Sequence, residues 1–156
     1  MANITRGRAW RMLAVLVVLA SASQDGHAQS DRKIGKWKLR VEPPAHGTRE
    51  YEDRGGGVTV STRQGVNARG QEYYSSYAAK VDGKEYPRLV KGSNGVNTIA
   101  FTQVDADTVA YTLRENGTVT ATGTTTVSKD GTVLTVTTKN VNAAGSGNPE
   151  IYDRIP

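Results

Sequence analysis

Few residues of this chain have the types and spacing that catalysis or metal binding needs. The 156 residues include two histidines and no cysteine. His27 lies in an N-terminal segment that we expect to be removed, so His46 would be the only histidine of the mature chain, in a turn-like context. A single loop histidine is usually a solvated side chain. Asp105 and Asp107 form the only close carboxylate pair outside turns, whereas calcium needs about six or more oxygen ligands. The sequence therefore predicts no metal site and no cofactor.

Motifs for nucleophilic catalysis and phosphate binding are also missing from the sequence. There is no Gly-x-Ser-x-Gly, no glycine-rich loop ahead of a helix, and no set of Ser, His and Asp with local support. The stretch Asn116-Gly117-Thr118 matches a glycosylation sequon, but its role as a turn explains it fully. We therefore expect that the protein is not an enzyme.

Charged residues near the C-terminus are the remaining candidates for chemistry. Glu150, Tyr152 and Arg154 alternate along the last segment, so they share one face if this segment is a strand. Arg154 either holds an anionic ligand group or pairs with Glu150. We favour the ion pair, because charged side chains inside a fold usually have partners.

The stretch from Asp107 to Val141, which precedes these residues, reads as three antiparallel strands in a row. Its side chains follow a two-residue period and are rich in threonine and valine, which favour strands over helices. Asn116-Gly117 suits a type I′ turn, because both central residues of that turn need a positive φ. Ser128 to Gly131 provides a second turn of the same kind.

The rest of the chain extends this meander. We expect further strands at Ile34 to Val41, Val58 to Val66, Tyr73 to Val81, Ile99 to Gln103 and Glu150 to Arg154. The stretch from His46 to Asp53 is expected to be an exposed polar strand or loop, Lys84 to Pro87 a short strand-like continuation, and Arg88 to Gly95 a loop. The sequence thus predicts an all-β fold, a single antiparallel up-and-down β-barrel of about eight to ten strands.

Several positions that should point into this barrel carry small or weakly polar side chains, namely Ser75, Ala79, Gly123, Thr125 and Thr138. Small inward side chains leave volume for a ligand or water. Alternatively, large neighbours fill the interior, because small barrels often alternate small and large side chains. We favour a cavity. Its expected lining consists of Tyr73, Tyr77, Phe101, Tyr111, Val136 and Tyr152, with Trp37 and Arg154 closing one end.

Trp37 on the first strand and Arg154 on the last strand are expected to meet. A closed barrel must pair its first and last strands to remove its edges, which brings the two ends of the fold together. The planar guanidinium of Arg154 can then stack on the indole ring of Trp37.

The N-terminal segment predicts export. Three arginines precede an apolar run from Met12 to Ala22 and a small-residue site that ends at Ala28, which is the pattern of a secretory signal peptide. Cleavage after Ala28 would leave residues 29–156 as one domain in the periplasm or outside the cell. The apolar run is shorter than a bilayer-spanning helix of about 20 residues, so we expect no transmembrane segment in the mature chain.

The charge of the chain argues against a nucleic-acid partner. Its formal net charge is +5 at pH 7, and the basic residues are spread singly among acidic ones. Nucleic-acid binding needs a clustered basic stripe with stacking aromatic residues. We expect a monomer with no nucleic-acid partner.

Three segments carry a resemblance to a known family. Gly35-Lys36-Trp37 resembles the Gly-x-Trp motif that opens lipocalins, and Arg154 resembles the late basic residue that packs across this Trp in calycins. Together with the segments Tyr77 to Pro87 and Val127 to Val136, the first segment resembles a group of small secreted bacterial lipocalin-like proteins of unassigned function. This resemblance spans nearly all of the mature chain and implies a lipocalin-like barrel.

The last strand also resembles that of intracellular fatty-acid-binding proteins, in which an inward Arg two residues before a Tyr holds the ligand carboxylate. Tyr152 matches that Tyr, but Glu150 stands in the Arg position. A carboxylate there would repel a fatty-acid carboxylate, so the head-group chemistry of that family does not carry over.

We therefore expect an exported lipocalin-like barrel that binds a small, largely apolar, lipid-like molecule in its interior. The alternative is a non-catalytic structural or interaction protein of the bacterial envelope with a filled barrel core. An enzyme ranks third, because the sequence names no catalytic group.

Overall fold

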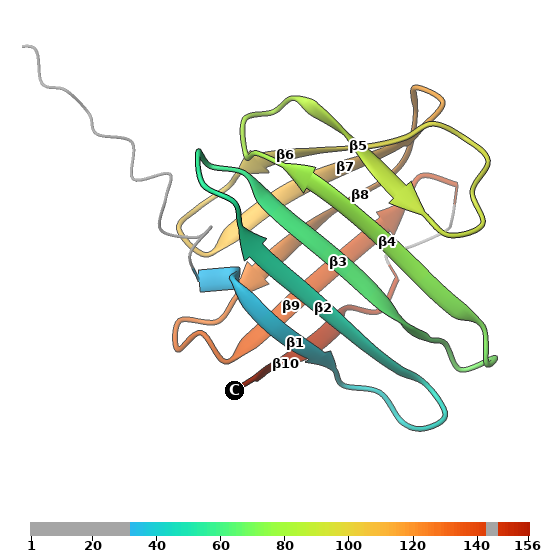
Figure 1. Ribbon diagram of the computed structural model, residues 1–156, viewed down its shortest axis with the longest axis vertical. Coiled ribbons are helices and arrows are strands. Elements are labelled where there is room, and N and C mark those ends of the chain that lie inside the picture. The colour runs from blue at the N-terminus through green and yellow to red at the C-terminus, as the bar shows by residue number, and fades with distance from the viewer. Residues whose placement is uncertain (1–31, 143–146) are drawn as a thin grey trace, which may run out of the picture.

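The computed structural model describes residues 32–142 and 147–156, which form ten strands and one closed antiparallel barrel (Figure 1). The expected signal peptide, residues 1–28, lies outside the described residues, as does the expected domain start at residue 29. The strands are β1 (Gly35–Leu39), β2 (His46–Asp53), β3 (Thr59–Val66), β4 (Glu72–Ala79), β5 (Glu85–Val90), β6 (Asn97–Gln103), β7 (Thr108–Glu115), β8 (Thr118–Val127), β9 (Val133–Asn140) and β10 (Glu150–Ile155).

Each strand pairs with its neighbours in sequence, and β1 closes the barrel by pairing with both β2 and β10. Figure 1 shows β1 in blue beside β10 in dark red. The prediction of an all-β, single antiparallel up-and-down barrel is confirmed.

The predicted meander from Asp107 to Val141 corresponds to β7, β8 and β9. At the turn between β7 and β8, φ is 50° at Asn116 and 79° at Gly117. These are the positive values that a type I′ turn requires, and their backbone twist matches that of the two strands. The turn therefore fixes the register that places Tyr111 opposite Gly123.

Two sequence predictions about the first half of the chain are wrong. The stretch from His46 to Asp53 is a strand, β2, but it is not an exposed one, because Tyr51 is only 2% exposed and lies in the core. Arg88 to Val90 is not loop but the second half of β5. The first half of β5 pairs with β6 and the second half with β4, and Pro87 lies where the pairing changes. Pro87 lacks a backbone hydrogen-bond donor, and a proline within a segment argues against a strand, so the sequence did not indicate β5.

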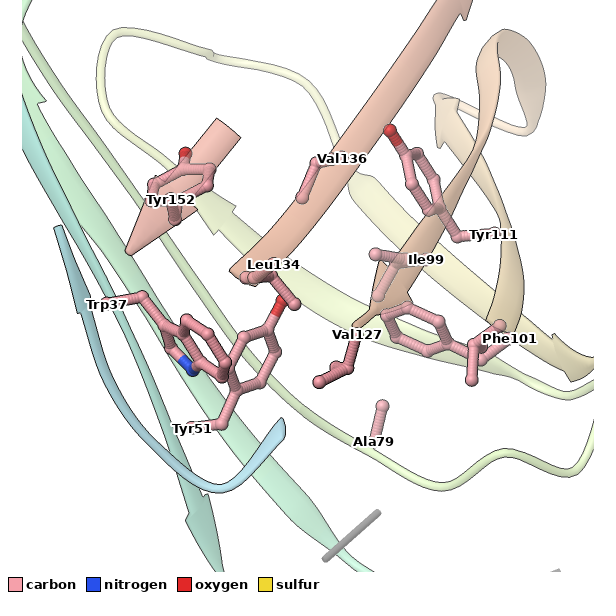
Figure 2. Close-up of a cluster of buried hydrophobic side chains, with 11 residues drawn as sticks. Trp37, Tyr51, Ala79, Ile99, Phe101, Tyr111, Val127, Leu134, Val136 and Tyr152 are labelled. Atoms are coloured by element: carbon pink, nitrogen blue, oxygen red, sulfur yellow. The ribbon is translucent and has the colours of Figure 1, made fainter. Parts of the chain in front are cut away.

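Side chains fill one end of the barrel, where the β2–β3, β4–β5, β6–β7 and β8–β9 turns lie. Trp37, Leu134 and Tyr152 have no exposed surface there, and Figure 2 shows them packed with Tyr51 and Val127. Aromatic contacts continue across the barrel, since the ring centroids of Tyr77 and Phe101 lie 5.2 Å apart. Burial of these large apolar side chains is the main source of stability for the closed barrel.

Trp37 and Arg154 meet where β1 pairs with β10, as the sequence predicted. The two residues are register partners, and the guanidinium carbon of Arg154 lies 4.2 Å from the centroid of the Trp37 ring. Gly35 makes room for this stack, because its φ is +127° and a Cβ there would come within 2.8 Å of Arg154 Nη1. The Gly-x-Trp spacing thus has a steric reason in this fold.

Arg154 also ties the ends of the chain to the barrel. Its Nη1 donates to the backbone carbonyl of Ile34 at 2.8 Å, and its Nε donates to that of Gly131 at 2.6 Å. The predicted pair between Arg154 and Glu150 is wrong, because the carboxylate of Glu150 pairs with Arg63 and Arg49 instead.

A double-mutant cycle tests the closing contact. Trp37→Ala should lower the free energy of unfolding by about 3–5 kcal/mol, because it empties a fully buried site. Arg154→Ala should cost about 1–2 kcal/mol, through loss of the stack and of backbone hydrogen bonds. In urea unfolding we expect the double variant to lose less than the two single losses together. Simple additivity would mean that the two side chains do not stabilise each other.

Candidate functional site

The other end of the barrel holds a cavity of about 260 Å³. Inward residues of nine strands, all but β1, contribute to its wall, so strands from all around the barrel surround it. The lining residues are Arg49, Ser61, Arg63, Ser75, Tyr77, Arg88, Ile99, Phe101, Tyr111, Leu113, Thr125, Val136, Thr138 and Glu150. Apolar and polar side chains thus share one enclosed space, which is the usual make-up of a small-molecule site.

Small inward residues create this cavity. Ser61, Ser75 and Thr125 are buried and line it. Gly123 acts differently, because it lies under Tyr111, where a Cβ would come within 2.5 Å of the tyrosine hydroxyl. The Tyr111 hydroxyl can therefore lie over the backbone of β8 and donate to the Thr137 carbonyl at 3.1 Å. Ser75 and Thr125, which the sequence predicted to point inward, thus leave empty volume in the cavity. Gly123 instead gives space to the large side chain of Tyr111.

The eight residues expected to line the cavity fall into three groups. Tyr77, Phe101, Tyr111 and Val136 line it. Trp37, Tyr152 and Arg154 belong to the filled end or to its closing contact. Tyr73 lines a separate groove at the same end of the barrel as the cavity, together with His46. The guanidinium carbon of Arg63 lies 4.3 Å from the centroid of the Tyr73 ring. Tyr73 therefore contacts a residue of the cavity wall without lining the cavity itself.

Three arginines and one glutamate form a charged cluster in the cavity wall. Arg49, Arg63 and Arg88 come from β2, β3 and β5, and Glu150 comes from β10. Arg49 and Arg63 are direct register partners, an arrangement in which like charges repel. Glu150 reduces this repulsion, because Arg63 Nη2 donates to its Oε1 and Arg49 Nη2 lies 3.7 Å from its Oε2.

Tyrosine hydroxyls complete this cluster. The Tyr152 hydroxyl donates to Glu150 Oε2 at 2.9 Å and accepts a hydrogen bond from Arg63 Nε at 3.4 Å. Arg49 Nη1 donates to the Tyr51 hydroxyl at 3.3 Å. The side chains of Arg63 and Glu150 keep 26% and 32% of their surface exposed, whereas Arg49 keeps 11%. The cluster therefore runs from the solvent-facing part of the cavity to its buried wall.

Sequence reasoning missed all three arginines. An arginine on a strand normally faces solvent, so Arg49 and Arg63 gave no sign of an inward position. The available signal was strand alternation, since Arg49 lies two residues from Tyr51 and Arg63 two residues from Ser61. Arg88 gives no such signal, because the sequence predicts a loop over Arg88 to Gly95, where the structure continues β5 to Val90.

Lys33 is a buried cation at the filled end that the sequence did not reveal. The residue is 5% exposed, and its Nζ lies 5.5 Å from the ring centroid of Tyr51 and 5.7 Å from that of Phe101. Among the described residues no carboxylate pairs with it. Burial lowers the pKa of Lys33 from its ordinary 10.5 to about 8, because the charged form loses its hydration.

The part of the chain that the structure describes has no cluster of three or more His, Cys, Asp or Glu residues suited to a metal ion. Within residues 32–142 and 147–156, no helix is long and apolar enough to cross a membrane. No protein-family model matches this chain, and a search of curated proteins finds no similar sequence.

The burial of Lys33 predicts that the free energy of unfolding depends on pH. Unfolded Lys33 keeps its proton up to a pH of about 10.5, whereas the folded form releases it near pH 8. Between these values the unfolded state binds more protons, so the stability of the folded state rises with pH. Below pH 8 the folded state carries the full free-energy cost of burying the charged amine of Lys33. Lys33→Met removes this cost and should raise the free energy of unfolding by roughly 2–3 kcal/mol at pH 7.

Urea unfolding of the two proteins between pH 7 and 10.5 measures this effect. The difference between Lys33→Met and the unsubstituted protein should shrink toward zero as the pH rises through this range. Taking the difference removes the titration of the tyrosines, which both proteins share. An exposed lysine gives the matched control, because Lys38→Met should shift stability little at any pH. A constant difference would contradict the burial of a charged Lys33.

Proposed function

We propose that this protein is an exported, lipocalin-like barrel that binds a small molecule with a largely apolar body in its interior, and that it acts by binding rather than by catalysis. The observation that carries this proposal is the cavity of about 260 Å³ at one end of a barrel whose other end is filled. A structural barrel gains stability by filling its interior. This one keeps small side chains at Ser61, Ser75 and Thr125, which leaves the space open.

The resemblance of Gly35 to Trp37 to the Gly-x-Trp motif supports the lipocalin-like part of the proposal. In this chain the motif has the geometry that the resemblance implies, because Trp37 stacks with Arg154 at the seam between the first and last strands. Export is supported by the signal-peptide pattern of residues 1–28.

Native mass spectrometry of the exported protein tests interior binding. We expect a monomer that carries a small co-purified adduct. Ser75→Phe should abolish the adduct, because Ser75 is buried in the cavity wall and a phenyl ring there occupies the ligand's space. Ser76→Phe is the matched control, since alternation places Ser76 on the outer face of β4 and the adduct should remain.

Thermal unfolding accompanies this experiment, because overpacking costs about 1–3 kcal/mol and both variants must be folded at the temperature used. An adduct that persists in Ser75→Phe would contradict interior binding. A monomer without an adduct that captures an envelope protein would support the alternative of a structural or interaction protein.

The mass of the exported protein tests export itself. Removal of the signal peptide after Ala28 should give a chain that begins at Gln29. Replacing the small residue at the cleavage site, Ala28→Leu, should leave the precursor uncut. An exported protein that retains residues 1–28, or one found only inside the cell, would contradict this part of the proposal.

A further inference from the structure

The charges in the cavity wall do not balance. Arg49, Arg63 and Arg88 supply three positive charges, and Glu150 is the only carboxylate among the described residues that line the cavity. Arginine stays protonated at any physiological pH. The cavity wall therefore carries a surplus of positive charge in a space where solvent screening is weak.

The carboxylate of Glu150 already has partners within the protein. One of its oxygens accepts from Arg63, and the other accepts from the Tyr152 hydroxyl and lies 3.7 Å from Arg49 Nη2. This carboxylate bridges the guanidinium groups of Arg49 and Arg63, which are register partners on β2 and β3. Within the described residues, no group accepts a hydrogen bond from the buried Arg49 Nε. Glu150 thus leaves at least one donor of its partner Arg49, the Nε group, without an acceptor among the described residues.

Arg88 has no such partner. None of the described residues forms an ion pair or a hydrogen bond with its side chain, although it lines the cavity from β5. Burial, followed by the charges of Arg49 and Arg63, lowers the pKa of Arg88. Each of these causes means that its guanidinium would gain free energy from a nearby anion.

The remaining wall and the volume limit what that anion can be. Ile99, Phe101, Leu113 and Val136 supply an apolar surface in the same cavity. At about 30 Å³ per water-sized group, a cavity of about 260 Å³ holds roughly nine such groups. A medium-chain or single-ring acid matches this volume, whereas a long fatty-acid chain would extend beyond it through the open side of the cavity.

We propose that the ligand is a small organic monoanion, a carboxylate with a short apolar body, whose head group pairs with Arg88 while Glu150 keeps its pairing with Arg63 and Arg49. This inference rests on interior binding as proposed above and names the class of ligand. Arg88 supplies the charge-assisted hydrogen bonds, and the apolar wall holds the body. The surplus positive charge is what selects an anion over a neutral molecule of the same shape.

Three probes with the same alkyl chain and different head groups distinguish the contribution of ligand charge to affinity from that of ligand shape. Octanoate, 1-octanol and octylamine are titrated into the exported protein at neutral pH by calorimetry. We expect octanoate to bind about tenfold or more tightly than 1-octanol, because an ionic hydrogen bond contributes at least that factor. Octylamine should bind most weakly, because its ammonium group meets the positive wall. Raising the salt concentration should weaken octanoate more than 1-octanol.

Arg88→Gln then tests the assignment to this residue. We expect the variant to bind octanoate and 1-octanol with affinities within about threefold of each other. It should melt at the same or a higher temperature than the unsubstituted protein, because it removes an unpaired charge. A structural arginine would instead lower the melting temperature on substitution. Arg40→Gln is the control, since Arg40 is exposed and pairs with Asp153 on the outside of the barrel; it should keep the full preference for octanoate.

Each outcome has one meaning. Equal affinities for octanoate and 1-octanol would overturn the anion preference and leave interior binding standing. A preference for octanoate that survives Arg88→Gln would overturn the role of Arg88. If none of the three probes binds, interior binding of molecules of this size is itself wrong, and the inference falls with it.

Discussion

The barrel depends on the pairing of β1 with both β2 and β10, because this short strand alone removes the two open edges of the sheet. Its five residues place Trp37 in the core and leave Gly35 without a side chain, so that the guanidinium of Arg154 can lie over the indole ring. The hydrogen bonds of Arg154 to the carbonyls of Ile34 and Gly131 link this seam to the β8–β9 turn. One side chain of β10 thus joins the residue before β1 to the β8–β9 turn.

Once the barrel is closed, its interior divides into two layers with different chemistry. Large aromatic and aliphatic side chains fill the layer around Trp37, whereas in the layer around Arg49 serines, threonines and charged groups line a cavity together with apolar side chains. The second layer is costly, because it desolvates guanidinium groups that one carboxylate cannot fully neutralise. Packing in the first layer offsets this cost, since its apolar side chains are almost completely buried.

The sequence revealed the architecture better than the site, for physical reasons. Two-residue periods and an Asn116-Gly117 turn are local features, so the meander and its register could be read directly. The small inward residues Ser75 and Thr125 were recognised because the period assigned their face. The inward arginines could not be recognised in this way, because a charged residue on a strand is normally exposed and becomes an exception only through partners distant in sequence. Glu150 was placed inside correctly, but its partners on β2 and β3 are set by barrel closure, which no local pattern encodes.

The two layers lie on the same strands, which has a consequence for how such a barrel can change its ligand. On β2, Arg49 in the cavity wall is two residues from Tyr51 in the filled core, and on β10 Glu150 in the cavity wall is two residues from Tyr152 in the filled core. Alternation keeps every second residue inward whatever its type, so a substitution in the cavity layer alters charge and shape there without changing the register. The filled layer and the Trp37 seam continue to hold the barrel closed. Stability and recognition are therefore set by different residues of one fold, and the cavity charges can be altered while the filled core is kept.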